Sequence, residues 1–462
     1  MKPKYFLALG LLVLGLGSCG ENFFEQYPSN NITEGNFYKT DDDFNQGVVA
    51  CYAKLKTQMS FHLTEIGYRG DENVLESMAV STQNRYDIDH FAETANNGIL
   101  NDIWNAWYNG IYRCNDVLDH MTGAKIANYD KYRGECLFLR SWWYFNLYRV
   151  FGVVPITRTV VTPAAAKLIP RCTEEEMYTL LTEDLAEAAR LLPPTPGPEK
   201  ARVANIAAYT LLAKVYLTFG KPAEAKTALE EAMKNTSYGL ESTTKKVFDV
   251  GNKMNREIIF ALYYNKTNDN GHGYWYSANT DVLADINNPT PTFKAIYDSE
   301  KDNRLPLISS YTKIKDNLFA MTKWYDTYDA TYTTQVGNDF PHLRYADVVL
   351  MYAEALAESG GSLGDALEWL NKTRTRAGLD ALKAEDVPSK GAFIEALADE
   401  RGREFALEGH RWFDLVRLGL AVDYFREMGY SLDSHNLIFP IPQNQIEIVN
   451  NPSILWQNPG FN

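Results

Sequence analysis

Many charged side chains lie in two segments that we predict to be helices, residues 340–358 and 400–419. Residues of these types can form an acid/base centre. The set is Arg344, Asp347, Glu354, Glu400, Arg401, Arg403, Glu404, Glu408, His410, Arg411, Asp414 and Arg417. Their spacing also fits i,i+3 and i,i+4 ion pairs, and charges are kept inside a protein when they are paired. We therefore predict structural salt bridges here and assign no catalytic residue.

A second kind of chemistry is indicated by two polar loops that also carry aromatic rings. They are residues 81–87 and residues 268–280, and glycines in the second loop let the backbone display its neighbours. The candidate ligand contacts are Asn84, Arg85, Tyr86, Tyr274, Trp275 and Tyr276. Aromatic faces pack on the C–H surfaces of a sugar while amide and charged groups bond its hydroxyls, so the loops suit carbohydrate binding. Ordinary loop packing is the alternative for each ring.

Motifs of common enzymes and metal sites give no support for catalysis. The sequence has no H-E-x-x-H, C-x-x-C or G-x-x-x-x-G-K-[ST] pattern, and its seven histidines are scattered. Its one G-x-S-x-G match, residues 360–364, falls at the turn between two predicted helices and not after a strand, as a nucleophile elbow requires. The acids at 40–43 resemble a calcium loop, but Gln46 and Tyr52 stand where that loop needs Gly and Glu. We predict no metal and no cofactor. A glycosidase needs only two facing carboxylates, and 59 acids leave that alternative open.

The N-terminal end has the charge-then-apolar order of a signal peptide. Lys2 and Lys4 precede the apolar stretch 6–17, which is too short to span a bilayer as a helix. The stretch leads into Leu-Gly-Ser-Cys, which resembles the lipobox of bacterial lipoproteins. We therefore predict that residues 1–18 are removed and that Cys19 is lipidated. An ordinary signal peptide with a chance cysteine is the alternative.

The net charge of the chain limits the kinds of ligand and partner that it is expected to bind. Its net charge is −14, and removal of Lys2 and Lys4 makes the mature chain still more acidic. This argues against nucleic acid as a partner and favours neutral ligands over polyanions.

Four further cysteines, Cys51, Cys114, Cys136 and Cys172, could form disulfides in an oxidising compartment, with three pairings open. A chain of this length buries a large core without such cross-links. We therefore expect buried free thiols, with the pairings left open as the alternative.

Helical patterns supply the elements that would position these residues. An apolar stripe at helical spacing follows the acids at 41–43, and residues 100–121 and 129–151 are the next predicted helical stretches. The four consecutive aromatic residues at 142–145 point in different directions on one helix, so we predict that most of them pack in the core.

Two segments have the spacing of a tetratricopeptide helix pair. Residues 209–232 place small and apolar side chains at this spacing with Gly220 at the turn, and residues 350–374 repeat the pattern more weakly. Two such copies far apart in sequence do not make a uniform solenoid. They indicate a mostly α fold in which helix pairs form a scaffold for large insertions.

The segment between the two pairs, about 236–340, is irregular. Its stretches 256–265 and 317–328 are rich in β-branched and aromatic residues and are separated by Asn, Asp, Gly and Pro, which predicts short strands in a loop-rich, partly β half. Trp324 lies in the second stretch and is expected in the core.

The C-terminal tail, residues 436–462, is apolar and interrupted by prolines. Pro440, Pro442, Pro452 and Pro459 predict an extended chain without a helix. Its six large apolar residues are predicted to be buried against the rest of the molecule. They are Ile438, Phe439, Ile441, Ile446, Ile448 and Trp456.

Several of these segments resemble one protein family. "RYADVVLMYAEA" at 344–355, "ERGREFALEGHRWFDLVRLG" at 400–419 and the tail phrases "FPIPQNQI" and "NPSILWQNPGF" closely resemble the SusD/RagB family. Glu135, Arg140 and the Phe-Gly-Val-Val-Pro at 151–155 also match, while Ser141 stands where the family usually has Ala. The resemblance covers most of the chain from Cys19 onward.

The resemblance implies one SusD-like domain at residues 19–462. It would have a helical scaffold at about 40–235 and 341–425, a ligand-facing insertion at about 236–340, and the tail. The family consists of outer-membrane lipoproteins that face outward, capture an oligosaccharide or polysaccharide and deliver it to a SusC-like TonB-dependent transporter, without catalysis. The RagB branch leaves a peptide ligand as an alternative, and a glycoside hydrolase or a pure interaction scaffold would belong to other classes.

Overall fold

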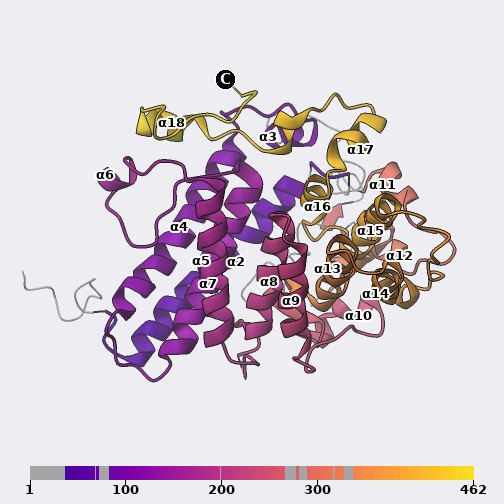
Figure 1. Cartoon of the computed structure of the whole chain (residues 1–462), viewed down its shortest axis with the longest axis horizontal. Helices are drawn as coiled ribbons and strands as arrows, with labels where there is room; N and C mark the ends of the chain where they lie inside the picture. The colour runs from indigo at the N-terminus through magenta and orange to yellow at the C-terminus, as the bar shows by residue number, and fades with distance from the viewer. Residues whose placement is uncertain are drawn as a thin grey trace, which may run out of the picture.

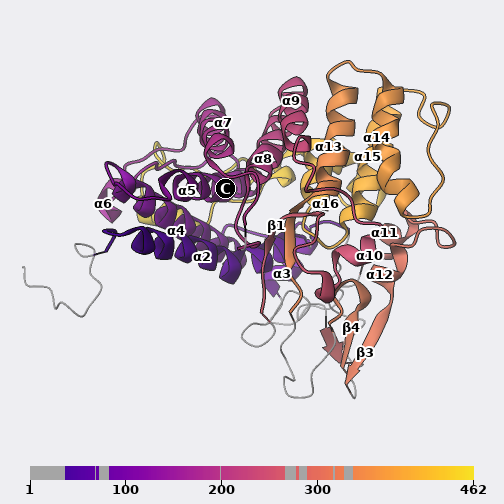
Figure 2. The ribbon, with the colours of Figure 1, turned by 90° about the horizontal axis from the view of Figure 1, so that it is seen from below.

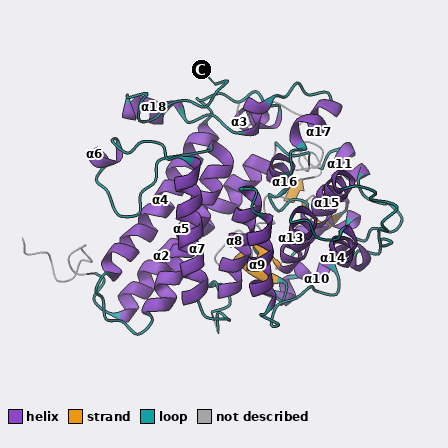
Figure 3. Cartoon of the chain, in the orientation of Figure 1, coloured by secondary structure: helices purple, strands orange, loops and turns teal. Residues whose placement is uncertain are grey.

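The computed structural model describes residues 37–67, 69–71, 83–197, 199–265, 277–279, 289–315, 318–326 and 337–461. Helices dominate these residues and strands are few, which confirms a mostly α protein (Figure 3). The helices are α2 (Asp41–Gly67), α3 (Gln83–Asp89), α4 (Gly98–Met121), α5 (Tyr129–Phe151), α6 (Pro163–Ala166), α7 (Glu174–Leu191), α8 (Asn205–Thr218), α9 (Pro222–Met233), α10 (Thr244–Val247), α11 (Pro291–Ala295), α12 (Leu305–Ser309), α13 (Tyr345–Glu358), α14 (Leu363–Arg376), α15 (Lys390–Phe405), α16 (Arg411–Arg417), α17 (Ala421–Glu427) and α18 (Gln443–Val449). The strands are β1 (Ile258–Leu262), β2 (Ser277–Asn279), β3 (Tyr311–Lys315), β4 (Leu318–Met321) and β5 (Phe340–Arg344).

The long helices form one array in which each packs on the next (Figure 1). The order of contact is α2, α4, α5, α7, α8, α9, α13, α14 and α15. The predicted tetratricopeptide-like pairs are α8/α9 and α13/α14, and they turn at the left-handed glycines Gly220, with φ 66°, and Gly360, with φ 83°. Because α9 packs directly on α13, the two pairs are neighbours in space although more than a hundred residues separate them in sequence.

Helix α5 lies inside this array. It packs against α2, α4, α7 and α8, so apolar side chains are needed around most of its circumference. The four aromatic residues at 142–145 are all buried, which confirms the core prediction. Gly110 of α4 makes room for one of them, because a Cβ at that position would lie 2.2 Å from the indole of Trp143.

The strands form two small sheets, which agrees with a partly β insertion. β1 pairs antiparallel with β5, with Ile258 opposite Arg344, and a three-stranded sheet has the order β2-β4-β3. The predicted strand region 256–265 contains β1, and 317–328 contains β4, the central strand of the three-stranded sheet, followed by a 3-10 turn. Trp324 is buried, as expected.

The C-terminal tail is not extended throughout, contrary to the prediction. Helix α18 begins directly after Pro442 and ends at Asn450, whose φ is 48°. A proline suits the start of a helix because its fixed φ fits the first turn and its missing N–H is not needed there. The prolines therefore bound a short helix instead of preventing one. The tail crosses the molecule beside the ends of α4 and α5 (Figure 1), and the Phe439 amide donates to the Val150 carbonyl of α5 at 2.8 Å.

The tail buries only part of its apolar surface. Phe439 and Ile441 are fully buried, whereas Ile448 is 51% exposed and Trp456 is 42% exposed. The prediction that all six apolar residues are buried is therefore wrong for these two, and Ile438 and Ile446 are only half-buried. Trp456 lies instead against the Arg171 guanidinium, 4.9 Å from its ring centroid, and α18 buries none of its own residues.

Residues 400–419 do not form the single helix predicted. The chain breaks between α15 and α16, where Leu407 and Gly409 have left-handed φ values of 63° and 75°. Glycine adopts this conformation without a steric penalty, so the chain can turn sharply. The turn sets the two helices against each other, and Arg401 of α15 pairs with Asp414 of α16 at 2.8 Å.

The cysteines Cys51, Cys114, Cys136 and Cys172 are buried free thiols. This agrees with the expectation that a core of this size does without disulfides. No helix within the described ranges has the length and apolar character needed to cross a bilayer.

Candidate functional site

The first predicted loop is a helix in the structure. Residues 83–87 belong to α3, a short helix that packs on α2 and α4, while residues 81 and 82 lie outside the described residues. Gln83 donates to Asp87 one turn later at 2.6 Å, a polar i,i+4 pair that supports the helix. Its other end is anchored by the buried residues Ile88 and Asp89.

Helix α3 is tied to the start of α4 through Asn97. The Asn97 side chain donates to the Asn84 carbonyl at 2.9 Å and accepts from the Ile99 amide at 3.0 Å, so one residue caps α4 and fixes α3. Gly98 lies beneath the Asn84 side chain, because a Cβ there would be 3.0 Å from the amide nitrogen. These contacts hold the predicted site residues at a fixed place on the helical array.

The three predicted residues of α3 differ in exposure. Asn84 is exposed, and Arg85 and Tyr86 are half-buried. The Tyr86 ring stacks on the His90 imidazole with centroids 3.8 Å apart and an angle of 17° between the planes. His90 Nδ1 lies 3.0 Å from the Tyr86 carbonyl, which fixes the imidazole in this position when Nδ1 carries the proton. The result is a half-buried aromatic pair beside an exposed amide.

His90 and the residues beneath the pair were missed by the sequence analysis. Phe91 follows α3 and packs edge-on against Phe425 and Tyr430, each with a centroid distance of 5.2 Å. Burial and the nearby Asp89 raise the pKa of Tyr430. These aromatic rings form a packed floor under α3. Helical i,i+4 spacing could have linked Tyr86 to His90 had the segment been recognised as a helix.

A buried cation completes this floor. Arg69 forms a fully buried ion pair with Glu93, and its guanidinium lies 4.9 Å from the Phe91 centroid and 3.9 Å from the Phe439 centroid. It also donates to the Asn436 carbonyl at 2.5 Å. The tail is therefore joined to the support of α3 by a charge, an aromatic contact and a hydrogen bond.

The other predicted contacts, Tyr274, Trp275 and Tyr276, lie outside the described residues, as does Cys19. Figure 2 shows α3 on the same side of the molecule as β3 and β4, with α9, α13 and α14 on the opposite side.

The charged segments form structural salt bridges, as predicted. Arg344 pairs with Glu257 at 2.8 Å, with Glu404 at 2.6 Å and with Glu408 at 2.8 Å. Arg304 joins the same network through Glu400 and Glu404. These side chains are almost fully buried, and the ion pairs connect α15 to β5 and to the segment before β1. Their carboxylates are held by guanidinium groups in an arrangement that stabilises the fold.

Comparisons with known proteins agree with this architecture. A model of the SusD family matches residues 302–461, and a model described as starch-binding proteins associating with the outer membrane matches residues 25–217. SusD-like protein P2 of Formosa agariphila is 25% identical over an alignment that covers 99% of this chain and 100% of that protein.

Solved structures show the same fold. A SusD superfamily protein from Bacteroides vulgatus superposes with a TM-score of 0.77 and 24% identity, covering 92% of this chain and 100% of that one. The surface glycan-binding protein A of Bacteroides thetaiotaomicron gives a TM-score of 0.76 and 22% identity, again over 92% of this chain and 100% of the other. The two family models cover both halves of the sequence, and the chain belongs to the SusD family.

Proposed function

We propose that this protein is a lipid-anchored, outward-facing protein of the outer membrane that captures a glycan and delivers it to a SusC-like TonB-dependent transporter. The observation that carries the proposal is the match of residues 25–217 to starch-binding proteins associating with the outer membrane. A similar fold in a surface glycan-binding protein supports it. Residues 1–18 would be the signal peptide, Cys19 the lipidated residue, and residues 19–462 a single domain.

The glycan would bind on the side of the molecule that carries α3. The half-buried Tyr86 ring, held by His90, offers an aromatic face to a sugar ring, and the exposed Asn84 amide and the Arg85 guanidinium offer groups to its hydroxyls. Tyr274, Trp275 and Tyr276 are proposed to complete the site. Binding of this kind makes and breaks no covalent bond, so the protein would act by equilibrium capture and release.

The ligand class is tested by titrating the mature protein, residues 19–462, with starch, a panel of other neutral polysaccharides and a panel of peptides in a calorimeter. We expect saturable binding of at least one glycan. Binding of peptides alone would replace the glycan proposal by a peptide-uptake role. Chromatography of the glycan after incubation should show unchanged chain length, and shortened products would contradict a role without catalysis.

The anchor and the partner are tested in the native host. Cys19→Ala should release the protein from the membrane fraction and abolish labelling by palmitate, while Cys172→Ala should leave both unchanged. Isolation of the lipidated protein in mild detergent should bring a TonB-dependent transporter with it. Labelling that persists in Cys19→Ala would rule out the proposed anchor.

A further inference from the structure

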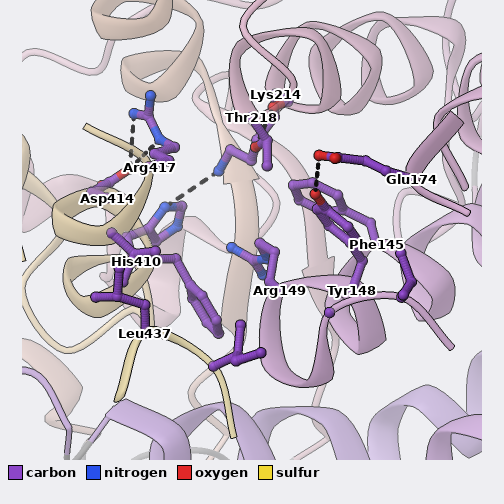
Figure 4. A pocket seen from close by; sticks show the side chains of 15 residues that line it. Phe145, Tyr148, Arg149, Glu174, Lys214, Thr218, His410, Asp414, Arg417 and Leu437 are labelled. Atoms are coloured by element: carbon purple, nitrogen blue, oxygen red, sulfur yellow. Dashed lines mark hydrogen bonds and ion pairs between the residues drawn. The ribbon is translucent and has the colours of Figure 1, made fainter. Parts of the chain in front are cut away.

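A cavity of about 450 Å³ lies on the helical array, between the C-terminal end of α5, helices α8 and α16, and the beginning of the tail. Its apolar walls are Phe145, Phe413, Leu437 and Ile438. Figure 4 shows Arg149 in the middle of the view, between His410 and Tyr148. Glu174 at the edge is exposed, so the cavity reaches the surface. Its volume suits a small organic ligand.

Arg149 is half-buried and has an unusual set of partners. Its guanidinium lies between two rings, 4.7 Å from the Phe145 centroid and 3.9 Å from the Phe413 centroid, and it donates one hydrogen bond to the Asn146 side chain. Its Nε is buried and has no hydrogen-bond partner in the described part of the chain. Burial lowers the pKa of Arg149 to about 9, because the charged form lacks the solvation it would have in water.

The charged side chains near Arg149 pair with one another and, among the described residues, provide no ion-pair partner for it. Three cations and three carboxylates beside the cavity form a chain of ion pairs, with Lys214 and Arg401 on Asp347, Arg401 and Arg417 on Asp414, and Arg417 on Glu354. Burial and the adjacent ammonium hold the pKa of His410 well below its ordinary value, so the imidazole is neutral. Glu174 accepts from Tyr148 at 2.9 Å and makes no ion pair with Arg149 within the described residues. Among the described residues, Arg149 is therefore a lining cation without an ion pair, and the Glu174 carboxylate stands at the exposed edge of the cavity.

Helix α5 contains a direct contrast to this residue. Arg140, on the same helix, donates to both oxygens of Asp184 at 2.8 and 2.9 Å, and to the Asn115 side chain at 2.9 Å. A buried arginine that serves the fold is expected to be paired in this way, since an unpaired buried charge is costly. Arg149 lacks such a carboxylate among the described residues, so its guanidinium is available to an anion.

We propose that this cavity is a second binding site, distinct from the α3 side, and that it takes a small carboxylate. The Arg149 guanidinium would pair with the carboxylate, and the apolar walls would cover the carbon body of the ligand. One unpaired guanidinium matches a monoanion, whereas a phosphate dianion would be repelled by Asp414 and Glu174. The carboxylate could belong to a simple organic acid or to an acidic sugar, and the two are separated by experiment.

The test measures the melting temperature of the mature protein with sodium benzoate or sodium glucuronate, each against its neutral isostere, benzamide or glucose, at equal ionic strength. We expect a saturable rise in melting temperature with a carboxylate and none with the isostere. A rise with benzoate identifies an organic acid, and a rise with glucuronate alone identifies an acidic sugar. In Arg149→Met the carboxylate should bind at least about tenfold more weakly.

The two arginines of α5 provide the matched control. Without ligand, Arg149→Met should have the same or a higher melting temperature than the parent, because an unpaired, half-buried charge is replaced by an apolar side chain of similar shape. Arg140→Met should lower it, because the buried Asp184 loses two short hydrogen bonds and keeps only Arg158 at 4.0 Å. The proposal is overturned if neither carboxylate gives a saturable effect, or if Arg149→Met lowers the melting temperature as much as Arg140→Met. Glycan binding at α3 should be unchanged in Arg149→Met.

Discussion

The ion-pair network between β5 and α15 and the surface of α3 use polar side chains in opposite ways. In the network, guanidinium and carboxylate groups are buried and saturate each other, as Arg344 does with Glu404 and Glu408. On α3, polar groups stand at the surface over a packed aromatic floor, with Asn84 exposed and Tyr86 stacked on His90. The richest concentration of charge in the sequence therefore supports the fold, whereas the proposed ligand contacts are a sparse set of polar groups at the surface.

This difference has a physical cause. A charge that is removed from water must be compensated within the protein, and a compensated charge has no capacity left for a ligand. A group that binds a ligand must keep part of its hydrogen-bonding capacity or ring surface open, and it needs rigid support to hold its position. The predictions below test whether the two regions separate stability from binding in this way.

We expect the largest change in the free energy of unfolding at acidic pH, because a fall in pH affects the carboxylates of the whole network. Burial alone would raise the pKa of Glu404, but Arg376 and Arg344 hold it well below its ordinary value of 4.5. Arg401 and Arg417 likewise hold the pKa of Asp414 well below 3.8 against the effect of burial. The unfolded chain takes up protons on these carboxylates near pH 4, while the native state keeps them ionised. The free energy of unfolding should therefore fall as the pH drops below about 4.5.

The pKa values of two other buried carboxylates are shifted upward, in the opposite direction. Burial raises the pKa of Glu257 and Glu135 above 4.5, so their protonation in the native state occurs at higher pH. Their contribution to stability increases as the pH falls and is complete once the pH reaches 4.5, so it does not counter the loss below that value. Urea denaturation followed by circular dichroism between pH 7 and pH 3 measures the free energy of unfolding, to which both groups of carboxylates contribute. A constant free energy of unfolding below pH 4.5 would contradict the role assigned to the network.

The next largest effect is expected from removing one cation of the network. Arg344→Met leaves three buried carboxylates without their shared partner, and breaking a buried pair in this way costs about 3–5 kcal/mol. The exposed pair of Arg426 and Asp423 provides the control, and Arg426→Ala should change the free energy of unfolding by less than about 0.5 kcal/mol. Denaturant unfolding of both variants gives the comparison. Equal stability of the two would mean that burial of the network adds nothing.

Sequence patterns predicted long helices well and contacts between distant elements poorly. The predicted helix 129–151 coincides with α5, because its long run rich in apolar and aromatic residues and the glycine that follows it are local signals. The salt bridges were expected between residues three or four apart, but Arg344 pairs with Glu257, 87 residues away, and with Glu404, 60 residues away. Such pairs exist only after β1, β5 and α15 have come together, so spacing cannot indicate them.

The site shows the same limit. Helix α3 is short and polar, and it is held by contacts with α2 and α4 that the local sequence does not encode, so it was predicted to be a loop. Tyr430 reaches the floor of the site from a segment more than 300 residues away. The residue types of Asn84, Arg85 and Tyr86 indicated binding because aromatic and amide groups occur together, and this depends on composition alone.

We expect an intermediate loss of stability when hydrogen bonds between the tail and the helical array are removed. The buried Asn458 side chain donates to the Phe151 carbonyl at 2.9 Å and to the Phe439 carbonyl at 2.7 Å, and it accepts from Arg171 at 2.7 Å. Asn458→Ala leaves buried groups without partners and should cost about 1–3 kcal/mol in the free energy of unfolding. Asn451→Ala, on an exposed part of the same tail, is the control and should be nearly neutral. Identical melting curves would show that the tail is not held by this residue.

At Tyr86 we expect the smallest change in the free energy of unfolding and the clearest separation of ligand binding from stability. Its ring is half-buried and its main aromatic contact is with His90, so Tyr86→Ala should change the free energy of unfolding by less than about 1 kcal/mol. Affinity for the glycan should fall by about 1–3 kcal/mol, by analogy with bases that stack on aromatic side chains. Tyr112→Ala is the matched control, because this tyrosine is 43% exposed and lies about 20 Å along α4 from its first turn. Calorimetric titration and melting curves of both variants decide the matter: if Tyr86→Ala binds as tightly as Tyr112→Ala, the ligand does not stack on α3. If it instead unfolds as readily as Arg344→Met, the surface of α3 belongs to the support of the fold, and the contrast between the two regions is lost.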